Sequence, residues 1–546
     1  MTVRGYVGLS LLAWMVACGG DGRRGLGVRV HRHVLAGLRA VGLGGQTWAW
    51  GEAPAFPELV ASPTRPKVGE ALRCSDAEGG DLPDAVWRRD GTPLTDGPAV
   101  ASAAGEVWTC THGARFAAPV IVGEAPVARN VLIVVLDDVG WLDVGASSDA
   151  TVLPQGSTLS AASTPRIDAL AAEGVTVTTA WAEPVCSPTR ASLLTGLHPL
   201  NHGLGTAIGE HGGDKEIELR GDHRTVADLF HAVRGGRTGA FGKWHLGGST
   251  RERMHPASLG FDAWSLTLAN LGTGEDEGYE HWTMNRNGSL FEESGYVPEA
   301  TIRDALAFIA SSGDTPWMAW VALHLAHAPY HLPPTSLAPV PIPEGNPVKF
   351  LSMVQAADTL VGRLLDGLGE RRSETLILLV GDNGTPQSAA RPPLTEDRVK
   401  TTVFEPGVRV PMVWVGPGLP AGTRRLGPVG VVDLLPTLAD LLGEPLTPQQ
   451  AASVDGRSVA AHLRVGSDEG LGPVYAEIYT PSDRAPEAFR SWHRAVRDRR
   501  WKLVDDNGER HLYDLVADPW ELRDVASRHS EVVTRLAAAF PPPRDD

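Results

Sequence analysis

Two long apolar runs dominate the pattern of hydrophobic and polar positions after residue 129. Asn130–Asp138 and Glu374–Gly384 are each continuously apolar before they end in polar side chains. Such runs are typical of strands that are buried on both faces of a parallel sheet. Between them, Leu351–Leu368 places Leu, Met, Ala and Val at helical spacing, which predicts a helix packed on that sheet. The pattern therefore predicts an α/β domain.

Both apolar runs end in side chains that carry oxygen. Asp137 and Asp138 close the first run, and Asp382 and Asn383 close the second. Ligands of open α/β sheets gather at the carboxyl ends of strands, so the two pairs are expected to converge on one cation. Three carboxylates and one amide are hard ligands, which favour Ca²⁺ first and Mg²⁺ second over zinc. The alternative is that each pair only caps a following helix.

The segment before residue 130 has a different pattern of apolar and polar positions. Between Pro63 and Gly123, short apolar runs alternate with Asp, Gly and Pro clusters, as in a small all-β sandwich. Trp87 lies between Cys74 and Cys110, which is the order of the indole and the inter-sheet disulfide in immunoglobulin-like domains. We therefore expect an immunoglobulin-like module at residues 53–125 with a Cys74–Cys110 disulfide. Chance placement of two cysteines and a tryptophan is the alternative.

Residues 1–18 have the proportions of an export signal peptide. Arg4 precedes an apolar core that is too short to span a membrane, and small residues follow it. The last four residues, Met-Val-Ala-Cys, resemble a bacterial lipobox, so Cys18 is the expected site of lipidation. Ordinary secretion, with Cys18 discarded, is the alternative. Both predict an exported protein in the bacterial periplasm or at the cell surface, with residues 19–52 as a tether.

Composition and charge narrow the class of protein. The 546 residues are 42% hydrophobic and 21% charged, which excludes a fibrous, coiled-coil or largely disordered chain. A formal charge of −16 has the wrong sign for a protein that binds nucleic acid or lies on anionic lipid. We therefore expect no nucleic-acid partner, and membrane contact only through an N-terminal lipid anchor. An anionic substrate would need Lys, Arg or a metal concentrated at its site.

The segment Val185–Gly196, VCSPTRASLLTG, carries the most specific motif. Cys186 is followed by Pro188 and Arg190 and then by an apolar stretch typical of the start of a helix. The segment resembles the C-x-P-x-R signature of type I sulfatases, which continues A-S-L-L-T-G. The alternative, a buried structural cysteine before a helix, explains neither Pro188 nor Arg190.

Further motifs follow in the family's order over residues 130–540. Two positions depart from the family's pattern: Pro406 replaces a glycine, which puts the local loop in doubt, and Gly381 stands where serine is commoner. The motifs GKWHLG, HLAHAPYH and KTTVFEPGVRVP supply the candidate site residues Lys243, His245, His327 and Lys400.

The resemblance implies a fold and an activity. The fold is an alkaline-phosphatase-like α/β sandwich with a large, mostly parallel sheet at residues 130–444, followed by a smaller α+β subdomain at 445–541 with an antiparallel sheet and a terminal helix. The activity is hydrolysis of a sulfate ester to an alcohol and inorganic sulfate. In the family, a maturation enzyme oxidises the cysteine at the position of Cys186 to Cα-formylglycine, whose hydrate attacks sulfur and later expels sulfate.

The resemblance also implies a role for each site residue. Arg190 and Lys243 are expected to hold residue 186, and His245 is expected to take its proton in the elimination step. Lys400 and His327 would hold the sulfate and the leaving oxygen, with one of the two as general acid. The divalent cation would be held by Asp137, Asp138, Asp382, Asn383 and the converted Cys186.

Two other functions stay open. A phosphonate or phosphate monoester hydrolase can share the nucleophile motif and the metal site, and a surface-binding lipoprotein with a dead catalytic domain is the alternative from another class. A sulfated small molecule and a sulfated glycan both fit as substrate. His324 and His331, which flank His327, are as consistent with supporting positions as with substrate contact.

Overall fold

The computed structural model divides the chain into two compact units, Met1–Pro126 and Val127–Asp546, which are described separately here. In the first unit it describes seven short strands between residues 60 and 121. In the second unit it describes residues 127–148, 160–209, 217–247, 253–272, 278–468, 471–482 and 488–542.

The described strands of the first unit pair antiparallel. β1 (Val60–Ser62) pairs with β2 (Arg73–Ser75), and β5 (Val107–His112) is the central strand of a second sheet. Cys18 and the side chains of Cys74 and Cys110 lie outside the described residues, so the disulfide and the immunoglobulin-like module stay predictions. The other strands of the second sheet are β3 (Val86–Arg89), β4 (Thr92–Pro93), β6 (Arg115–Phe116) and β7 (Val120–Ile121).

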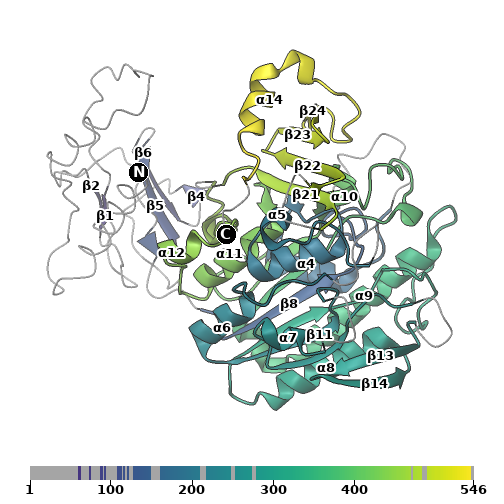
Figure 1. The fold of residues 1–546 in the computed structure, drawn as a ribbon. Helices are drawn as coiled ribbons and strands as arrows, with labels where there is room; N and C mark the ends of the chain where they lie inside the picture. Colours follow the sequence, from purple (N-terminus) through teal and green to yellow (C-terminus); the bar gives the residue numbers. More distant parts are fainter. Residues whose placement is uncertain are drawn as a thin grey trace, which may run out of the picture. The chain divides into compact units, whose positions relative to one another are not determined.

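A ten-stranded mixed sheet forms the centre of the second unit (Figure 1). The two predicted apolar strands are confirmed as β8 (Asn130–Leu136) and β16 (Thr375–Gly381), which lie side by side and parallel. Every residue of both strands is buried, as an uninterrupted apolar run predicts. The parallel centre continues through β15 (Trp317–Ala322), β11 (Arg237–Lys243) and β12 (Ala263–Thr267).

Antiparallel pairs flank this centre at both edges, so the sheet is mixed, but most of its strands run in one direction, as predicted. At one edge, the hairpin of β13 (His281–Arg286) and β14 (Ser289–Ser294) runs antiparallel, because Asn287 and Gly288 adopt positive φ values of 46° and 88° in a two-residue turn. At the other edge, antiparallel pairing joins β16 to β18 (Met412–Val415) and β18 to β9 (Val175–Val177), and β19 (Thr423–Arg425) then pairs parallel with β9.

Helices cover both faces of the sheet. Successive side chains of a strand point to opposite faces, so alternate side chains of β8 enter two different hydrophobic cores. The predicted helix at 351–368 is confirmed as α9 (Val348–Gly367), which packs on one face with α3 (Pro165–Ala172) and α8 (Val297–Ser311). The opposite face is covered by α4 (Cys186–Thr195), α6 (Val226–Arg234) and α11 (Leu434–Leu441).

Shorter elements connect these layers. A three-stranded sheet contains β10 (Ala180–Trp181), β17 (Arg409–Val410) and β20 (Val429–Gly430). Short helices are α5 (Pro199–His202), α7 (His255–Ser258), α10 (Glu405–Val408), α12 (Pro448–Ala451) and α13 (Ala460–Val465). Short 3₁₀ helices are η2 (Gly369–Glu374), η3 (Gln387–Ala389), η4 (Val431–Asp433) and η6 (Ala526–Arg528).

The end of the chain forms the expected small antiparallel sheet and terminal helix, drawn in yellow-green and yellow in Figure 1. Helix α14 (Ser530–Ala537) packs its buried Leu536 against Val496, Leu503 and Leu512 of this sheet. None of the described helices is long and apolar enough to cross a membrane. The four strands are β21 (Val474–Thr480), β22 (Ser491–Arg497), β23 (Trp501–Asp506) and β24 (Glu509–Asp514).

Candidate active site

The paired strands β8 and β16 bring the two predicted oxygen pairs together. Leu136 and Gly381 are register partners, so Asp137 and Asp382 leave the sheet from adjacent strand ends. The backbone N–H of Asp138 donates to Asp382 Oδ1 at 3.0 Å. Asp138 has a φ of 60°, in the left-handed region that non-glycine residues rarely adopt, which is a strained conformation typical of functional sites.

Two buried oxygens of this group have no hydrogen-bond partner in the described structure. Asp137 Oδ1 and Asn383 Oδ1 are both unpaired, whereas Asn383 Nδ2 donates to Asp138 Oδ1 at 2.9 Å. An unpaired buried carboxylate or amide oxygen is costly unless a ligand satisfies it. The donor set therefore fits a hard cation such as Ca²⁺ or Mg²⁺.

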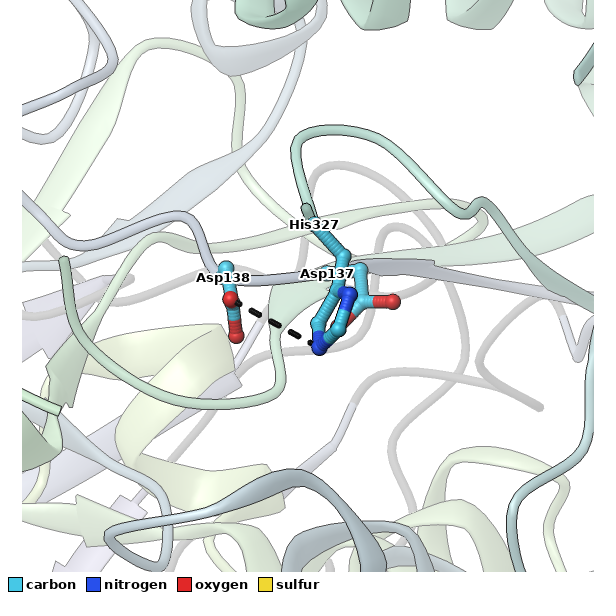
Figure 2. Close-up of side chains that lie close together, drawn as sticks. All are labelled: Asp137, Asp138 and His327. Atoms are coloured by element: carbon cyan, nitrogen blue, oxygen red, sulfur yellow. Dashed lines mark ion pairs between the residues drawn. The ribbon is translucent and has the colours of Figure 1, made fainter. Parts of the chain in front are cut away.

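A histidine comes close to the same oxygens. One potential ligand atom from each of Asp137, Asp138 and His327 lies within 4.8 Å of the others, and Figure 2 shows His327 directed toward the two carboxylates. His327 Nε2 lies 4.0 Å from Asp138 Oδ2. Burial, reinforced by the charge of Lys243, lowers the pKa of His327 to about 4. The imidazole is therefore neutral and has one ring nitrogen free to accept a proton or bind a metal.

Two lysine side chains pair with the carboxylates. Lys243 Nζ donates to Asp137 Oδ2 at 2.7 Å, and Lys400 Nζ donates to Asp138 Oδ1 at 2.6 Å. Burial opposes ionisation of Asp138, but the positive charge of Lys400 outweighs it and lowers the pKa of Asp138 below its ordinary range. The same pairing raises the pKa of Lys400, although burial acts against it.

Arg190 connects the nucleophile helix to both strand ends. Its Nε and Nη2 donate to Asp382 Oδ2 at 3.1 and 2.8 Å, and its Nη1 donates to the carbonyl of Lys243 at 2.7 Å. The guanidinium is completely buried, so this fork of hydrogen bonds is shielded from water. Burial and the charge of Asp137 raise the pKa of Asp382 to about 6, even with Arg190 beside it.

Cys186 is fully buried and is the first residue of α4, which therefore begins before the apolar stretch at which the sequence predicts a helix to start. Its Sγ lies 3.1 Å from His245 Nδ1, and His245 Nε2 lies 2.9 Å from the carbonyl oxygen of Ile208. Because a carbonyl can only accept, Nε2 carries the proton and Nδ1 faces the sulfur as an acceptor. Burial and the charge of Lys243 lower the pKa of His245, and burial raises the pKa of the Cys186 thiol to about 11.

The pocket beside these groups has a wall of residues that sequence analysis did not single out. Asn270, Leu271 and Tyr279 line it together with Asp137, Lys243, His324, His327 and Ala328. The Tyr279 hydroxyl donates to the carbonyl of His327 at 2.7 Å and so supports the loop that carries this histidine. The segment between β12 and β13 contains no motif or periodicity that could have indicated this role.

The two histidines that flank His327 differ in burial and in whether they line the pocket. His324 is buried, lines the pocket and pairs through Nε2 with Thr267 Oγ1 at 2.9 Å. His331 is only partly buried, does not line that pocket, and pairs with the Tyr296 hydroxyl at 3.0 Å. His331 therefore occupies a supporting position.

Comparisons with known proteins show which family the chain resembles. A family model described as Sulfatase matches residues 129–444. The N-acetylgalactosamine-6-sulfatase of Canis lupus familiaris is 28% identical over 366 residues, which are 61% of this chain and 65% of that protein. The ulvan-active sulfatase of Formosa agariphila is 27% identical over 435 residues, covering 74% of this chain and 78% of that protein.

A solved structure extends the similarity to three dimensions. The crystal structure of Ps i-CgsB in complex with k-i-k-neocarrahexaose is 26% identical, with a TM-score of 0.62. The match covers 76% of this chain and 92% of that chain. The chain thus spans about 65% of the length of the mammalian relative and nearly all of the solved one.

Proposed function

The chain belongs to the sulfatase family, and from that premise we propose that it hydrolyses a sulfate ester to an alcohol and inorganic sulfate. One observation carries the proposal: Cys186 begins a buried helix beside Lys243, Lys400 and the carboxylate group at the strand ends. A sulfate ester carries a negative charge and gains charge on its bridging oxygen as that bond breaks. Cationic groups in a water-poor pocket stabilise this charge.

We propose that Cys186 is converted to Cα-formylglycine by a maturation enzyme that reads the CSPTR segment. This group supplies a carbonyl that takes up water and provides the oxygen nucleophile. His245 would accept a proton at Nδ1, because its Nε2 already faces the Ile208 carbonyl. Arg190 would hold residue 186 in place through its bonds to Asp382 and the Lys243 carbonyl.

The proposed cation is Ca²⁺, with Mg²⁺ as second choice, held by Asp137, Asp138, Asp382, Asn383 and the converted residue 186. The unpaired Oδ1 atoms of Asp137 and Asn383 support this assignment. Bound there, the cation would supply positive charge for a sulfate oxygen. Histidine is a less suitable ligand for such a hard cation, so His327 is proposed to contact the substrate and not the cation.

Lys400 and His327 are the proposed groups for the sulfate and the leaving oxygen. Lys400 Nζ lies on the Asp138 side of the site, and His327 lines the pocket with its Nε2 toward the same carboxylate. The leaving oxygen takes its proton from one of these two side chains. Lys400 is buried and the His327 side chain is 12% exposed, which limits the access of water to the sulfate.

A sulfated glycan is the proposed substrate class, in preference to a small sulfated molecule. The relatives include an ulvan-active sulfatase and N-acetylgalactosamine-6-sulfatases, and the similar solved structure holds a neocarrahexaose. Asn270 and Tyr279 add polar groups to the pocket wall that sugar hydroxyls could contact. Export, lipidation at Cys18 and the immunoglobulin-like module belong to the same proposal and rest on the sequence alone.

Two measurements test the proposed reaction. Mass spectrometry of the tryptic peptide that ends at Arg190 should show the Cys186 thiol replaced by an aldehyde. Converted enzyme should then hydrolyse p-nitrophenyl sulfate faster than p-nitrophenyl phosphonate and phosphate esters, and a screen of sulfated glycans should find a better substrate still. Faster turnover of the phosphorus esters would establish the alternative hydrolase, and an unconverted cysteine in native cells would support a binding protein.

A further inference from the structure

Besides Arg190, a buried carboxylate outside the ligand set joins the two segments that carry the proposed cation ligands. These segments, 137–143 and 382–385, are called the ligand loops below. Asp143 belongs to the first loop, is completely buried, and accepts hydrogen bonds at Oδ2 from Gly140 N at 2.9 Å and Thr385 Oγ1 at 2.7 Å. One carboxylate oxygen therefore ties the turn after Asp138 to the residues after Asn383.

The other oxygen of Asp143 is held as well. Arg391 Nη1 donates to Asp143 Oδ1 at 3.0 Å, and Arg391 Nη2 donates to the Ser160 carbonyl at 3.1 Å. The Arg391 guanidinium is itself buried, at 5% exposure. Gly140 N–H, the Thr385 hydroxyl and the Arg391 guanidinium all donate to this carboxylate, so both of its oxygens serve as acceptors.

Packing at Gly140 shows how little space separates the two ligand loops. A Cβ added at Gly140 would lie 2.6 Å from Thr385 Oγ1 and 2.8 Å from Thr385 N. The φ of Gly140 is not in the left-handed region, so close approach of the loops, and not backbone conformation, requires glycine here. Thr385 also accepts from Lys400 N through its carbonyl at 2.9 Å, which extends the connection to the lysine that pairs with Asp138.

We propose that Asp143 is a positioning residue that sets the separation between the Asp137–Asp138 pair and the Asp382–Asn383 pair, and thereby the affinity for the cation. The proposal rests on the cation site of the proposed function. Groups that orient metal ligands commonly change metal affinity ten- to a hundredfold when they are altered. Asp143 touches neither the pocket nor the unpaired oxygens, so its effect passes through the loop geometry alone.

Two substitutions disturb this arrangement by different routes. Asp143→Asn keeps the volume but has a single acceptor oxygen, so its amide N–H₂ must face either Gly140 N–H or the Arg391 guanidinium. Gly140→Ala keeps every hydrogen-bonding group but pushes Thr385 away. Asp358→Ala is the control for loss of a buried carboxylate: Asp358 is 2% exposed and accepts from Ile167 N at 2.7 Å, on the face of the sheet covered by α3 and α9.

The experiment is calorimetric titration of the full chain with CaCl₂ after removal of bound metal, combined with thermal unfolding of each variant. Asp143→Asn and Gly140→Ala should each weaken calcium binding about tenfold or more. Asp358→Ala should lower thermal stability and leave calcium affinity within about twofold. If Asp143→Asn does not fold, Thr385→Val removes only the hydroxyl bond and should weaken binding about threefold.

The outcomes separate this inference from the proposed function. Calcium affinity unchanged in the Asp143, Gly140 and Thr385 variants, with normal binding by the unsubstituted protein, overturns the positioning role alone. Calcium affinity that falls equally in Asp358→Ala also overturns it, because the effect would then follow general destabilisation. An unsubstituted protein that binds no calcium overturns the cation site and this inference together.

Discussion

Two clusters of buried charge in this molecule have similar composition and differ in which atoms they leave unpaired. The active-site cluster joins Asp137, Asp138 and Asp382 to Arg190, Lys243 and Lys400. The second cluster, called the Glu405 cluster below, joins Glu405 and Glu521 to Arg497 and Lys502 where α10 meets the C-terminal sheet. Both clusters contain as many basic side chains as carboxylates.

The Glu405 cluster is closed on itself. Lys502 Nζ lies 2.8 Å from Glu521 Oε1 and 3.4 Å from Glu405 Oε1, and Arg497 pairs with Glu405 Oε2. Glu521 Oε2 also accepts from Glu405 N at 2.6 Å, and Trp181 Nε1 donates to Glu405 Oε1 at 3.1 Å. Lys502 lies 4.6 Å from the centre of the Trp181 ring, so even its ammonium face is covered. Each of the four charged side chains therefore has an ion-pair partner within the cluster.

The active-site cluster differs because Asp137 Oδ1 and the neighbouring Asn383 Oδ1 are unpaired. Its charges balance without a cation, so a bound divalent cation would leave an excess of positive charge that attracts a sulfate ester. Buried charge thus has two uses in one protein. The closed cluster holds the C-terminal sheet against α10. The open cluster keeps oxygen atoms that a cation could bind.

The largest expected effect is on turnover and comes from the open cluster. Cys186→Ala should reduce sulfatase turnover by about three orders of magnitude or more, because no carbonyl can then form at this position. The midpoint temperature of its thermal unfolding should stay close to that of the unsubstituted enzyme, because the thiol loses a single side-chain hydrogen bond, to His245. Wild-type activity in this variant would refute the proposed mechanism.

The largest expected effect on stability comes from the closed cluster. Lys502→Ala leaves Glu405 and Glu521 buried with less compensation, which should lower the free energy of unfolding by about 3–5 kcal/mol in urea titrations. Lys502→Met, which keeps the volume of the side chain, separates loss of charge from loss of packing. The folded fraction of both variants should keep the kcat of the unsubstituted enzyme. A fall in kcat without loss of stability would contradict the purely structural role of the Glu405 cluster.

Removal of the cation should have an intermediate effect. Chelation should abolish most turnover, with recovery on addition of Ca²⁺ and weaker recovery with Mg²⁺, because all proposed protein ligands donate oxygen. At a calcium concentration a hundred times Kd, binding should add about 2.7 kcal/mol to the free energy of unfolding. Elemental analysis of the purified enzyme provides an independent measurement. Stoichiometric zinc without calcium or magnesium would contradict the assignment.

The smallest effect is expected from removal of the first unit. A chain that begins near Ala125 retains the whole second unit, Val127–Asp546, with both charge clusters. It should hydrolyse a small aryl sulfate at a rate within about twofold of the full chain, because domains of this kind fold as separate units. Cys74→Ser in the full chain should destabilise only the predicted module, by roughly 2–5 kcal/mol. A soluble, converted but inactive truncated enzyme would show that the first unit takes part in catalysis.

Sequence patterns predicted the open cluster well because its members sit at recognisable places. Asp137 and Asp382 follow uninterrupted apolar runs, and neighbouring parallel strands deliver their ends to the same edge. Cys186 and Arg190 share one helix and a specific motif. The position of each of these residues was therefore predictable from local pattern, although its hydrogen-bond partners were not.

The Glu405 cluster and the pocket wall could not be predicted in this way. Lys502 and Glu405 are 97 residues apart, and their pairing depends on how the C-terminal sheet docks on α10. Asn270 and Tyr279 lie in a segment without periodicity, and the antiparallel edges of the large sheet depend on short turns. Long-range packing decides these features, and a single sequence carries no local signal for it.

The burial of α4 has a consequence for the order of events in biosynthesis. Every residue of this helix from Cys186 to Thr195 is buried, so an enzyme that needs the segment in extended form has no access to it once the chain has folded. If Cys186 is converted as proposed, each molecule can acquire catalytic activity only in the interval between its synthesis and its folding. The supply of maturation enzyme during that interval would then fix the active fraction for the lifetime of the protein, and molecules that fold too early would persist as stable, inert copies.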